Sequence, residues 1–90
     1  MKFNEWSKER IRKGTKRLTS RREMHLADSD IDWVTPFPLP LWFICEFLYR
    51  DEGADSPEDL KKQIDKIFRK KVDINREFYV HVIKKNVIER

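Results

Sequence analysis

The stretch WSKERIRKGTKRLTSR, residues 6–21, decides the fold of this chain. Its first part predicts a short helix from Asn4 to Lys13, with Asn4 or Ser7 as the N-terminal cap. Gly14 follows at the place where a helix end needs a left-handed residue. The helix has a weak apolar stripe, so we expect tertiary packing to hold it in place.

The second part of the stretch, Lys16 to Arg21, predicts a strand. Side chains alternate between the two faces of a strand. Leu18 therefore points inward on one face, and the opposite face carries Arg17, Thr19 and Arg21. A helix, a glycine turn and a basic strand thus open the chain.

Residues 23–32 show no clear period and read as a loop, and four further elements follow in the chain. Residues 31–37 predict a strand, which Pro36 confines to an edge or an end of a sheet. Pro40 to Glu52 predicts a helix that is apolar almost all round and therefore buried, with Trp42 and Cys45 in the core and Gly53 as its stop.

Ser56-Pro57-Glu58-Asp59 is a strong helix start, with a serine cap, a proline in the first turn and acids at the positive end. The helix has one apolar face, formed by Leu60, Ile64, Ile67 and Phe68. Residues 77–84 then alternate, with apolar residues on both faces. This pattern is typical of a central strand.

Composition and charge describe one small domain, residues 1–90. The net charge of +4 is unevenly distributed along the chain. Residues 1–23 carry a net charge of +6, residues 24–59 a net charge of −8 and residues 60–90 a net charge of +6. Clustered Lys and Arg gain affinity for polyanions by releasing phosphate counterions. The pattern favours a nucleic-acid partner, and a solvated mixed-charge surface is the alternative.

Several classes of protein are disfavoured. No apolar run approaches the roughly 20 residues that a membrane span needs, and the N-terminus lacks an apolar signal core, so we expect a cytoplasmic protein. The single cysteine, Cys45, excludes an internal disulfide and a multi-cysteine zinc site. His25 and His81 have no acid or cysteine at metal spacing, so we expect no metal and no cofactor.

Three segments together resemble the ASCH (activating signal cointegrator homology) domains of the PUA-like superfamily. Residues 6–21 match a helix followed by G-x-K-x-x-T-x-R on a strand. Residues 51–60 match an E-G dipeptide before an S-x-E-[ED]-L helix start, and residues 77–82 resemble the final barrel strand. The resemblance implies an α+β fold, with about three helices on a small, mostly antiparallel β-barrel or open sheet.

One segment departs from the family pattern. Many ASCH domains place a Gly-Asp turn and an extra strand after the Thr-x-Arg strand, whereas residues 23–32 contain no glycine. We therefore expect an abbreviated or open barrel. An open sheet edge invites pairing with another chain, so a homodimer through that edge is one predicted assembly.

The resemblance implies either nucleic-acid binding or, in one branch, hydrolysis of the amide of an N4-acylated cytidine. That branch uses a Lys, a Thr three residues later and a Glu, which match Lys16, Thr19 and, with one residue of gap, Glu52. Thr19 would be the nucleophile, Lys16 would take its proton and Glu52 would orient the lysine or shuttle the proton. The alternative is a structural ion pair between Lys16 and Glu52 beside an ordinary strand threonine.

The spacing of the two strand residues sets a geometric condition. Residues i and i+3 on a regular strand point to opposite faces, so Lys16 and Thr19 share a site only if the strand is irregular or the lysine curls round its edge.

The remaining candidates concern nucleic acid. Arginine forks match phosphate geometry, which makes Lys13, Arg17, Arg21 and Arg22 candidate phosphate contacts. Of the three tryptophans, Trp33 has the most exposed sequence context and is the candidate for stacking on a base. Three functions follow: RNA or single-stranded nucleic-acid binding in a basic cleft, an amidohydrolase acting on a modified nucleoside, or a small protein-interaction module.

Overall fold

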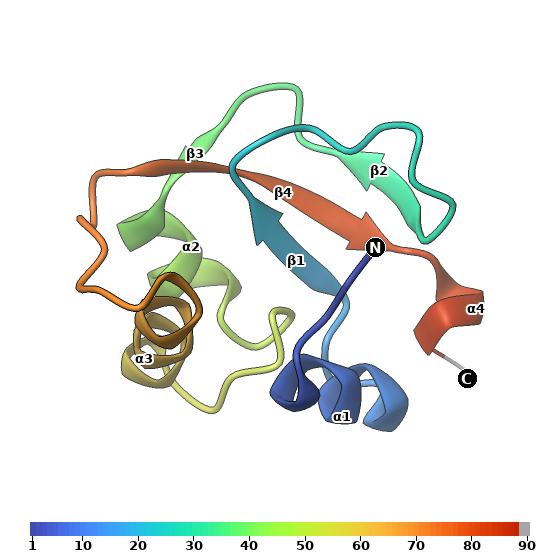
Figure 1. Cartoon of the computed structure of the whole chain (residues 1–90), viewed down its shortest axis with the longest axis horizontal. Helices are drawn as coiled ribbons and strands as arrows, with labels where there is room; N and C mark the ends of the chain where they lie inside the picture. Colours follow the sequence, from blue (N-terminus) through green and yellow to red (C-terminus); the bar gives the residue numbers. More distant parts are fainter. Residues whose placement is uncertain (89–90) are drawn as a thin grey trace.

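The computed structural model describes residues 1–88, which form an α+β fold with four helices and an open sheet of four antiparallel strands (Figure 1). In chain order the elements are α1 (Glu5–Lys13), β1 (Leu18–Arg21), β2 (Ile31–Val34), β3 (Leu39–Pro40), α2 (Leu41–Leu48), α3 (Pro57–Phe68), β4 (Glu77–Ile83) and α4 (Lys85–Ile88). The α+β class predicted from the sequence is confirmed. The short helix α4 was not predicted.

The last strand, β4, is the centre of the sheet, as its two apolar faces predicted. β1 pairs with it on one side, and β2 and β3 pair with it on the other. β2 lies at an edge and ends at Val34, before Pro36, which agrees with the edge position predicted for this segment. β1 also lies at an edge, so one side of that strand has no neighbouring strand in the described residues.

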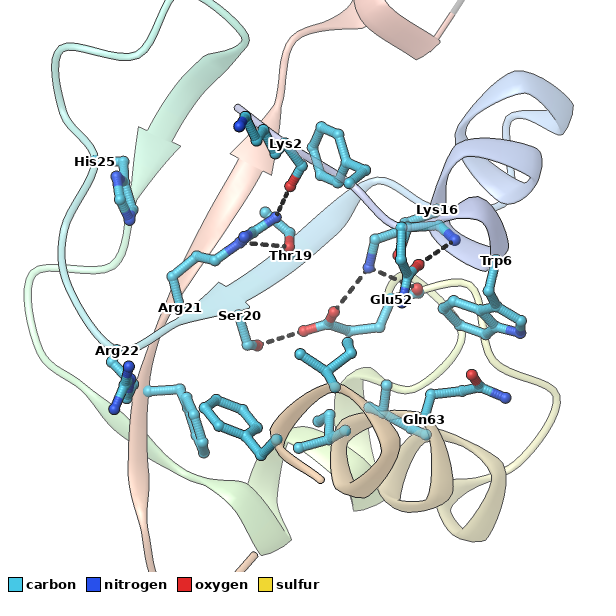
Figure 2. A pocket seen from close by; sticks show the side chains of 18 of the residues that line it. Lys2, Trp6, Lys16, Thr19, Ser20, Arg21, Arg22, His25, Glu52 and Gln63 are labelled. Carbon is cyan, nitrogen blue, oxygen red and sulfur yellow. Dashed lines mark hydrogen bonds and ion pairs between the residues drawn. The ribbon is translucent and has the colours of Figure 1, made fainter. Parts of the chain in front are cut away.

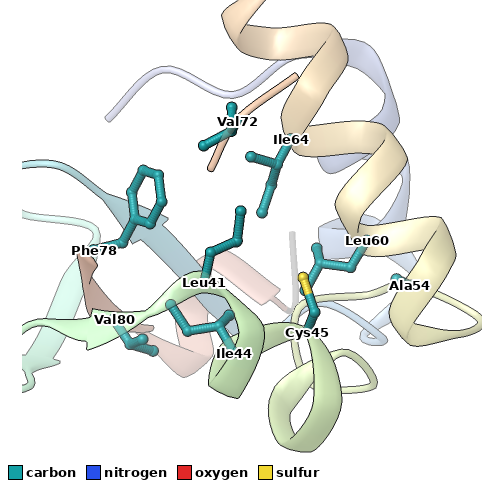
Figure 3. Packing of buried hydrophobic residues seen from close by; sticks show 9 residues of the cluster. All are labelled: Leu41, Ile44, Cys45, Ala54, Leu60, Ile64, Val72, Phe78 and Val80. Atoms are coloured by element: carbon teal, nitrogen blue, oxygen red, sulfur yellow. The ribbon is translucent and has the colours of Figure 1, made fainter. Parts of the chain in front are cut away.

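Two clusters of buried residues lie on the two faces of the sheet. The larger one joins α2 and α3 to β4 (Figure 3) and consists of Leu41, Ile44, Cys45, Ala54, Leu60, Ile64, Val72, Phe78 and Val80. The smaller one joins α1 and α4 to the other face and consists of Ile11, Ile31, Val34, Ile83 and Val87. Burial raises the pKa of the Cys45 thiol to about 11, so this cysteine is a protonated core residue at neutral pH.

The predicted all-round burial of the second helix is wrong. α2 buries Leu41, Ile44 and Cys45, but Trp42 is 46% exposed and Phe47 is 64% exposed. The helix packs against the sheet and α3 on one side only, and no described segment covers its outer side. The expectation that Trp42 lies in the core fails for this reason.

The predicted ends of two elements also change. The second helix stops at Leu48 rather than at Glu52, and the first strand starts at Leu18 rather than at Lys16. The segments at these ends contact each other: the backbone N–H groups of Arg17 and Leu18 donate to the Asp51 carbonyl, at 2.6 and 2.9 Å.

The predicted helix caps are confirmed. The Asn4 side chain accepts a hydrogen bond from the Ser7 N–H, and Gly14 ends α1 with a φ of 78°. The Ser56 side chain accepts from the Asp59 N–H at the start of α3, where Pro57 occupies the first turn. These caps fix the positions of α1 and α3, the two helices that flank the site described below.

His81, on the inward part of β4, predicts a pH dependence of stability. Burial lowers its pKa below the ordinary 6.5, and its Nε2 atom accepts the His25 N–H at 3.0 Å, which requires an unprotonated nitrogen. The unfolded chain therefore binds more protons than the folded one around pH 6.

We expect the free energy of unfolding to fall as the pH drops from 7.5 to 5.5, and the His81→Gln variant to show a flatter dependence. Urea titrations across this range measure both slopes, and a wild-type stability that rises toward pH 5.5 would contradict the assignment.

Candidate active site

A pocket of about 620 Å³ lies beside β1, between the N-terminal segment, α3 and the segment that carries Glu52 (Figure 2). One wall is polar and carries Lys16, Thr19, Ser20, Arg21 and Glu52. The other wall is apolar and comes mainly from α3 and β4: Leu60, Ile64, Ile67, Phe68 and Phe78. Cavities of roughly 300–1,000 Å³ with an apolar lining and a few converging polar groups are typical small-molecule sites.

A buried ion pair lies at one end of this pocket. The Lys16 Nζ donates to a Glu52 carboxylate oxygen at 3.1 Å and to the Glu52 backbone carbonyl at 3.0 Å. Lys16 is only 3% exposed and Glu52 only 2%. The backbones of the two residues also form an isolated antiparallel bridge, which brings their side chains together. Burying a charge away from water costs free energy unless an opposite charge pairs with it. Each of these two side chains therefore needs the other in order to stay charged in this buried place.

A hydroxyl group completes the contacts of the carboxylate. The Ser20 hydroxyl donates to the second oxygen of Glu52, on the side away from Lys16 (Figure 2). Glu52 therefore receives a hydrogen bond from Lys16 on one oxygen and from Ser20 on the other. Ser20 was not among the site residues predicted from the sequence. The alternation of side chains along residues 16–21 was the available signal, because it places Lys16 and Ser20 on the same face of the strand.

Thr19 lies on the other face of β1. Its hydroxyl oxygen accepts a hydrogen bond from the Arg21 Nε at 3.3 Å, and its partner across the sheet is His81. β1 is regular from Leu18 to Arg21, so no bulge rotates Thr19 toward Glu52. Residues from both faces of β1, Thr19 and Ser20, line the pocket. Lys16, Thr19 and Glu52 thus line one pocket, but only Lys16 and Glu52 are in direct contact.

The ion pair is positioned by α1 and by a tight turn at Gly53. Arg10 donates from its Nε to the Gly53 carbonyl at 2.8 Å and stacks on Trp6, with its guanidinium carbon 4.3 Å from the ring centroid. Gly53 has a φ of 95°, and a Cβ atom there would lie 3.0 Å from the Lys16 Cβ. Both the backbone conformation and the close approach require glycine at this position.

Two arginines lie along the same pocket. Arg21 is half-buried and donates to the Lys2 carbonyl at 2.9 Å, and its guanidinium lies 5.4 Å from the Phe3 ring centroid. Desolvation lowers the pKa of Arg21 from its ordinary value, an effect that the nearby Glu52 charge opposes. Arg22 is exposed and stacks on Phe68 at 5.5 Å. The pocket rim therefore carries positive charge.

The other candidates for nucleic-acid contact do not line this pocket. Lys13 is exposed on α1 and pairs with Glu9 at 2.9 Å, and Arg17 is exposed. Trp33 is 55% exposed on β2, which agrees with its expected exposure. Trp6, by contrast, is half-buried and lines the pocket. Of the five predicted nucleic-acid contacts, Arg21 and Arg22 line the pocket, and the other three do not.

Within residues 1–88, no three or more His, Cys, Asp or Glu side chains are grouped so that they could hold a metal ion. In the same part of the chain, no helix has the length and apolar character that crossing a membrane requires.

No family model, no curated protein and no solved structure matches this chain in the comparisons with known proteins.

Proposed function

We propose that this chain is an ASCH-type, PUA-like domain that acts as a small amidohydrolase on a modified nucleoside, with N4-acetylcytidine as the first candidate substrate. The observation that carries the proposal is the buried Lys16–Glu52 pair, whose carboxylate also binds a hydroxyl group at the end of a pocket of nucleoside size. A nucleoside is small and has one flat apolar ring and one polar sugar, which suits a pocket with one apolar and one polar wall.

The pocket offers separate places for the parts of such a ligand. The apolar side of α3, with Phe68 and Ile64, can hold the flat face of a base, and Trp6 lies near the ion pair. The polar wall at Lys16 and Glu52 then faces the exocyclic amide. A charged pair in a partly enclosed, water-poor place interacts more strongly with developing charge than the same pair in water.

The chemistry needs a proton acceptor, a nucleophile and a positive group. Amide hydrolysis through a hydroxyl nucleophile moves the hydroxyl proton to a base and then to the leaving nitrogen. Glu52 and Lys16 supply a base and a positive charge within 3.1 Å of each other. The resemblance assigns the nucleophile to Thr19, which lines the same pocket.

The test is a direct assay of N4-acetylcytidine hydrolysis, with release of cytidine followed by liquid chromatography. We expect turnover by the wild type and loss of at least about a hundredfold in kcat/KM for Lys16→Ala. Lys66→Ala is the matched control, because it removes an exposed lysine from the outer side of α3. Absence of cytidine release by folded wild-type protein would contradict the proposal.

A second candidate is RNA or single-stranded nucleic-acid binding, in which one nucleotide of a strand occupies the pocket. Arg21 and Arg22, which line the pocket, favour this candidate. Their guanidinium groups can bind the phosphates on either side of a nucleotide whose base occupies the pocket. A strand bound in this way could carry the modified nucleoside, so the two functions are compatible.

Binding of short single-stranded and structured RNAs at two salt concentrations tests this candidate. We expect affinity to fall steeply with salt and to fall further for Arg21→Ala/Arg22→Ala, because each lost phosphate contact reduces counterion release. Lys66→Ala/Lys70→Ala removes the same charge from exposed positions on and just after α3. Equal losses for the two double variants would show a general charge effect and contradict a phosphate site at the pocket.

A further inference from the structure

The carboxylate of Glu52 distinguishes the two hydroxyl groups of β1. The Ser20 hydroxyl donates a hydrogen bond to Glu52, whereas the Thr19 hydroxyl contacts Arg21. A hydroxyl nucleophile is weak until a neighbouring base takes its proton, so direct contact with the base is the first geometric requirement. Ser20 meets this requirement and Thr19 does not.

The register of the sheet gives Ser20 a second relevant group, its backbone N–H. Ser20 pairs with Val80 across the sheet, and both the N–H and the carbonyl of Val80 bond to Thr35 instead of to β1. Ser20 and Val80 are therefore a non-hydrogen-bonded pair of the antiparallel ladder, in which the backbone N–H groups point away from the partner strand. The Ser20 N–H therefore faces the free edge of β1, where the pocket lies.

We propose that Ser20, rather than Thr19, is the nucleophile of the amidohydrolase, with Glu52 as its base and the Ser20 N–H as a donor to the oxyanion. This inference rests on the proposed function of the pocket. It assigns the reaction to a hydroxyl that the family resemblance does not name, on the basis of the contacts around Glu52.

The proposed reaction has two stages, acylation of Ser20 and hydrolysis of the resulting ester. The Ser20 oxygen bonds to the acyl carbon while its proton moves to Glu52, giving a tetrahedral oxyanion. The C–N bond then breaks, and the proton on Glu52 moves to the leaving nitrogen, which gives the free amine and an ester on Ser20. Water attacks the ester with Glu52 again taking a proton. The C–O bond to Ser20 breaks as its oxygen is reprotonated, which gives the carboxylic acid and the free enzyme.

The charges of the ion pair suit these steps. Before the reaction, Lys16 and Glu52 balance each other in a buried place. When Glu52 takes the serine proton, the positive charge of Lys16 remains and the new negative charge forms on the acyl oxygen. The net charge of the site stays constant, so no charge is left unbalanced at the tetrahedral step. Lys16 thus acts through Glu52 and by stabilising the oxyanion.

The test uses p-nitrophenyl acetate, an activated acyl donor, with wild-type protein quenched in acid during the first turnovers. Trypsin releases residues 18–21 as one peptide that contains both Thr19 and Ser20. Fragment ions of this peptide then locate the acetyl group, and cleavage by hydroxylamine shows that it is an ester. We expect the acetyl ester on Ser20.

Variants give a second measurement on the same donor. We expect Ser20→Ala to lower the rate of enzyme-dependent hydrolysis about a hundredfold or more, and Thr19→Val to lower it by much less. Ser20→Cys should restore acyl transfer, as a thioester at the same position. Ser29→Ala, at an exposed position in the loop before β2, is the matched serine control, and thermal unfolding of each variant checks that it is folded.

The outcomes separate the two proposals. An ester on Thr19, or a Ser20→Ala variant that reacts as fast as Ser29→Ala, would overturn the assignment of Ser20. An ester on Ser20 without release of cytidine from N4-acetylcytidine would keep Ser20 as the nucleophile and reject the proposed substrate.

Discussion

Replacing Glu52 by glutamine is expected to abolish the proposed amide hydrolysis and to lower the free energy of unfolding by about 3–5 kcal/mol. The change leaves the Lys16 ammonium, 3% exposed, beside a neutral amide, and a buried charge without its partner is strongly destabilising. It also removes the carboxylate that contacts the Ser20 hydroxyl, which is the proposed base. Urea unfolding gives the change in stability, and the N4-acetylcytidine assay gives the change in turnover.

The double variant Lys16→Met/Glu52→Leu separates folding from chemistry. Replacing both members of a buried ion pair by apolar residues is often neutral or stabilising. We expect this variant to be much closer to the wild type in stability than Glu52→Gln, and still to lack turnover. A Glu52→Gln variant with wild-type stability would contradict the buried pair, and a double variant that retains turnover would contradict its chemical role.

Replacing Phe78 by alanine is expected to lower the free energy of unfolding by about 3–5 kcal/mol. Phe78 is 1% exposed, belongs to the larger core cluster and contacts the Phe68 ring at a centroid distance of 5.8 Å. Truncation removes apolar burial and leaves a cavity between the sheet and α3. In a domain of this size, each kcal/mol lowers the midpoint of thermal unfolding by roughly 4–8 °C.

The same substitution on the surface is the control. Phe37 is 74% exposed in the segment between β2 and β3, so Phe37→Ala should change stability by about 0.5 kcal/mol or less. Comparable losses for the two variants would contradict the core that joins β4 to α2 and α3. Because Phe78 also lines the pocket, Phe78→Ala should in addition weaken binding of a nucleoside.

The elements with strong local signals were predictable from the sequence. Asn4, Gly14 and Ser56 cap their helices as expected, because capping depends on short-range hydrogen bonds. The central position of β4 followed from its two apolar faces. The contact between Lys16 and Glu52 was also anticipated, from a resemblance rather than from periodicity.

Tertiary contacts decided the rest. The exposure of Trp42 could not be read from α2, because an apolar helix is buried only where other elements cover it. The early end of α2 is followed by hydrogen bonds from Arg17 and Leu18 to Asp51, which join segments far apart in sequence. Ser20 was missed because a serine in a short strand has no distinguishing pattern until its partner, Glu52, is known.

NMR titration of isotope-labelled wild-type protein with N4-acetylcytidine shows directly whether a nucleoside binds in this pocket. We expect the largest shifts of backbone amide signals at Lys16, Ser20 and Glu52, and a shift of the Trp6 indole signal, since these groups line one pocket. The Lys16→Met/Glu52→Leu variant should show much weaker shifts there. Shifts centred on Trp33 or on the outer side of α3, or none at saturating ligand, would contradict a nucleoside site in this pocket.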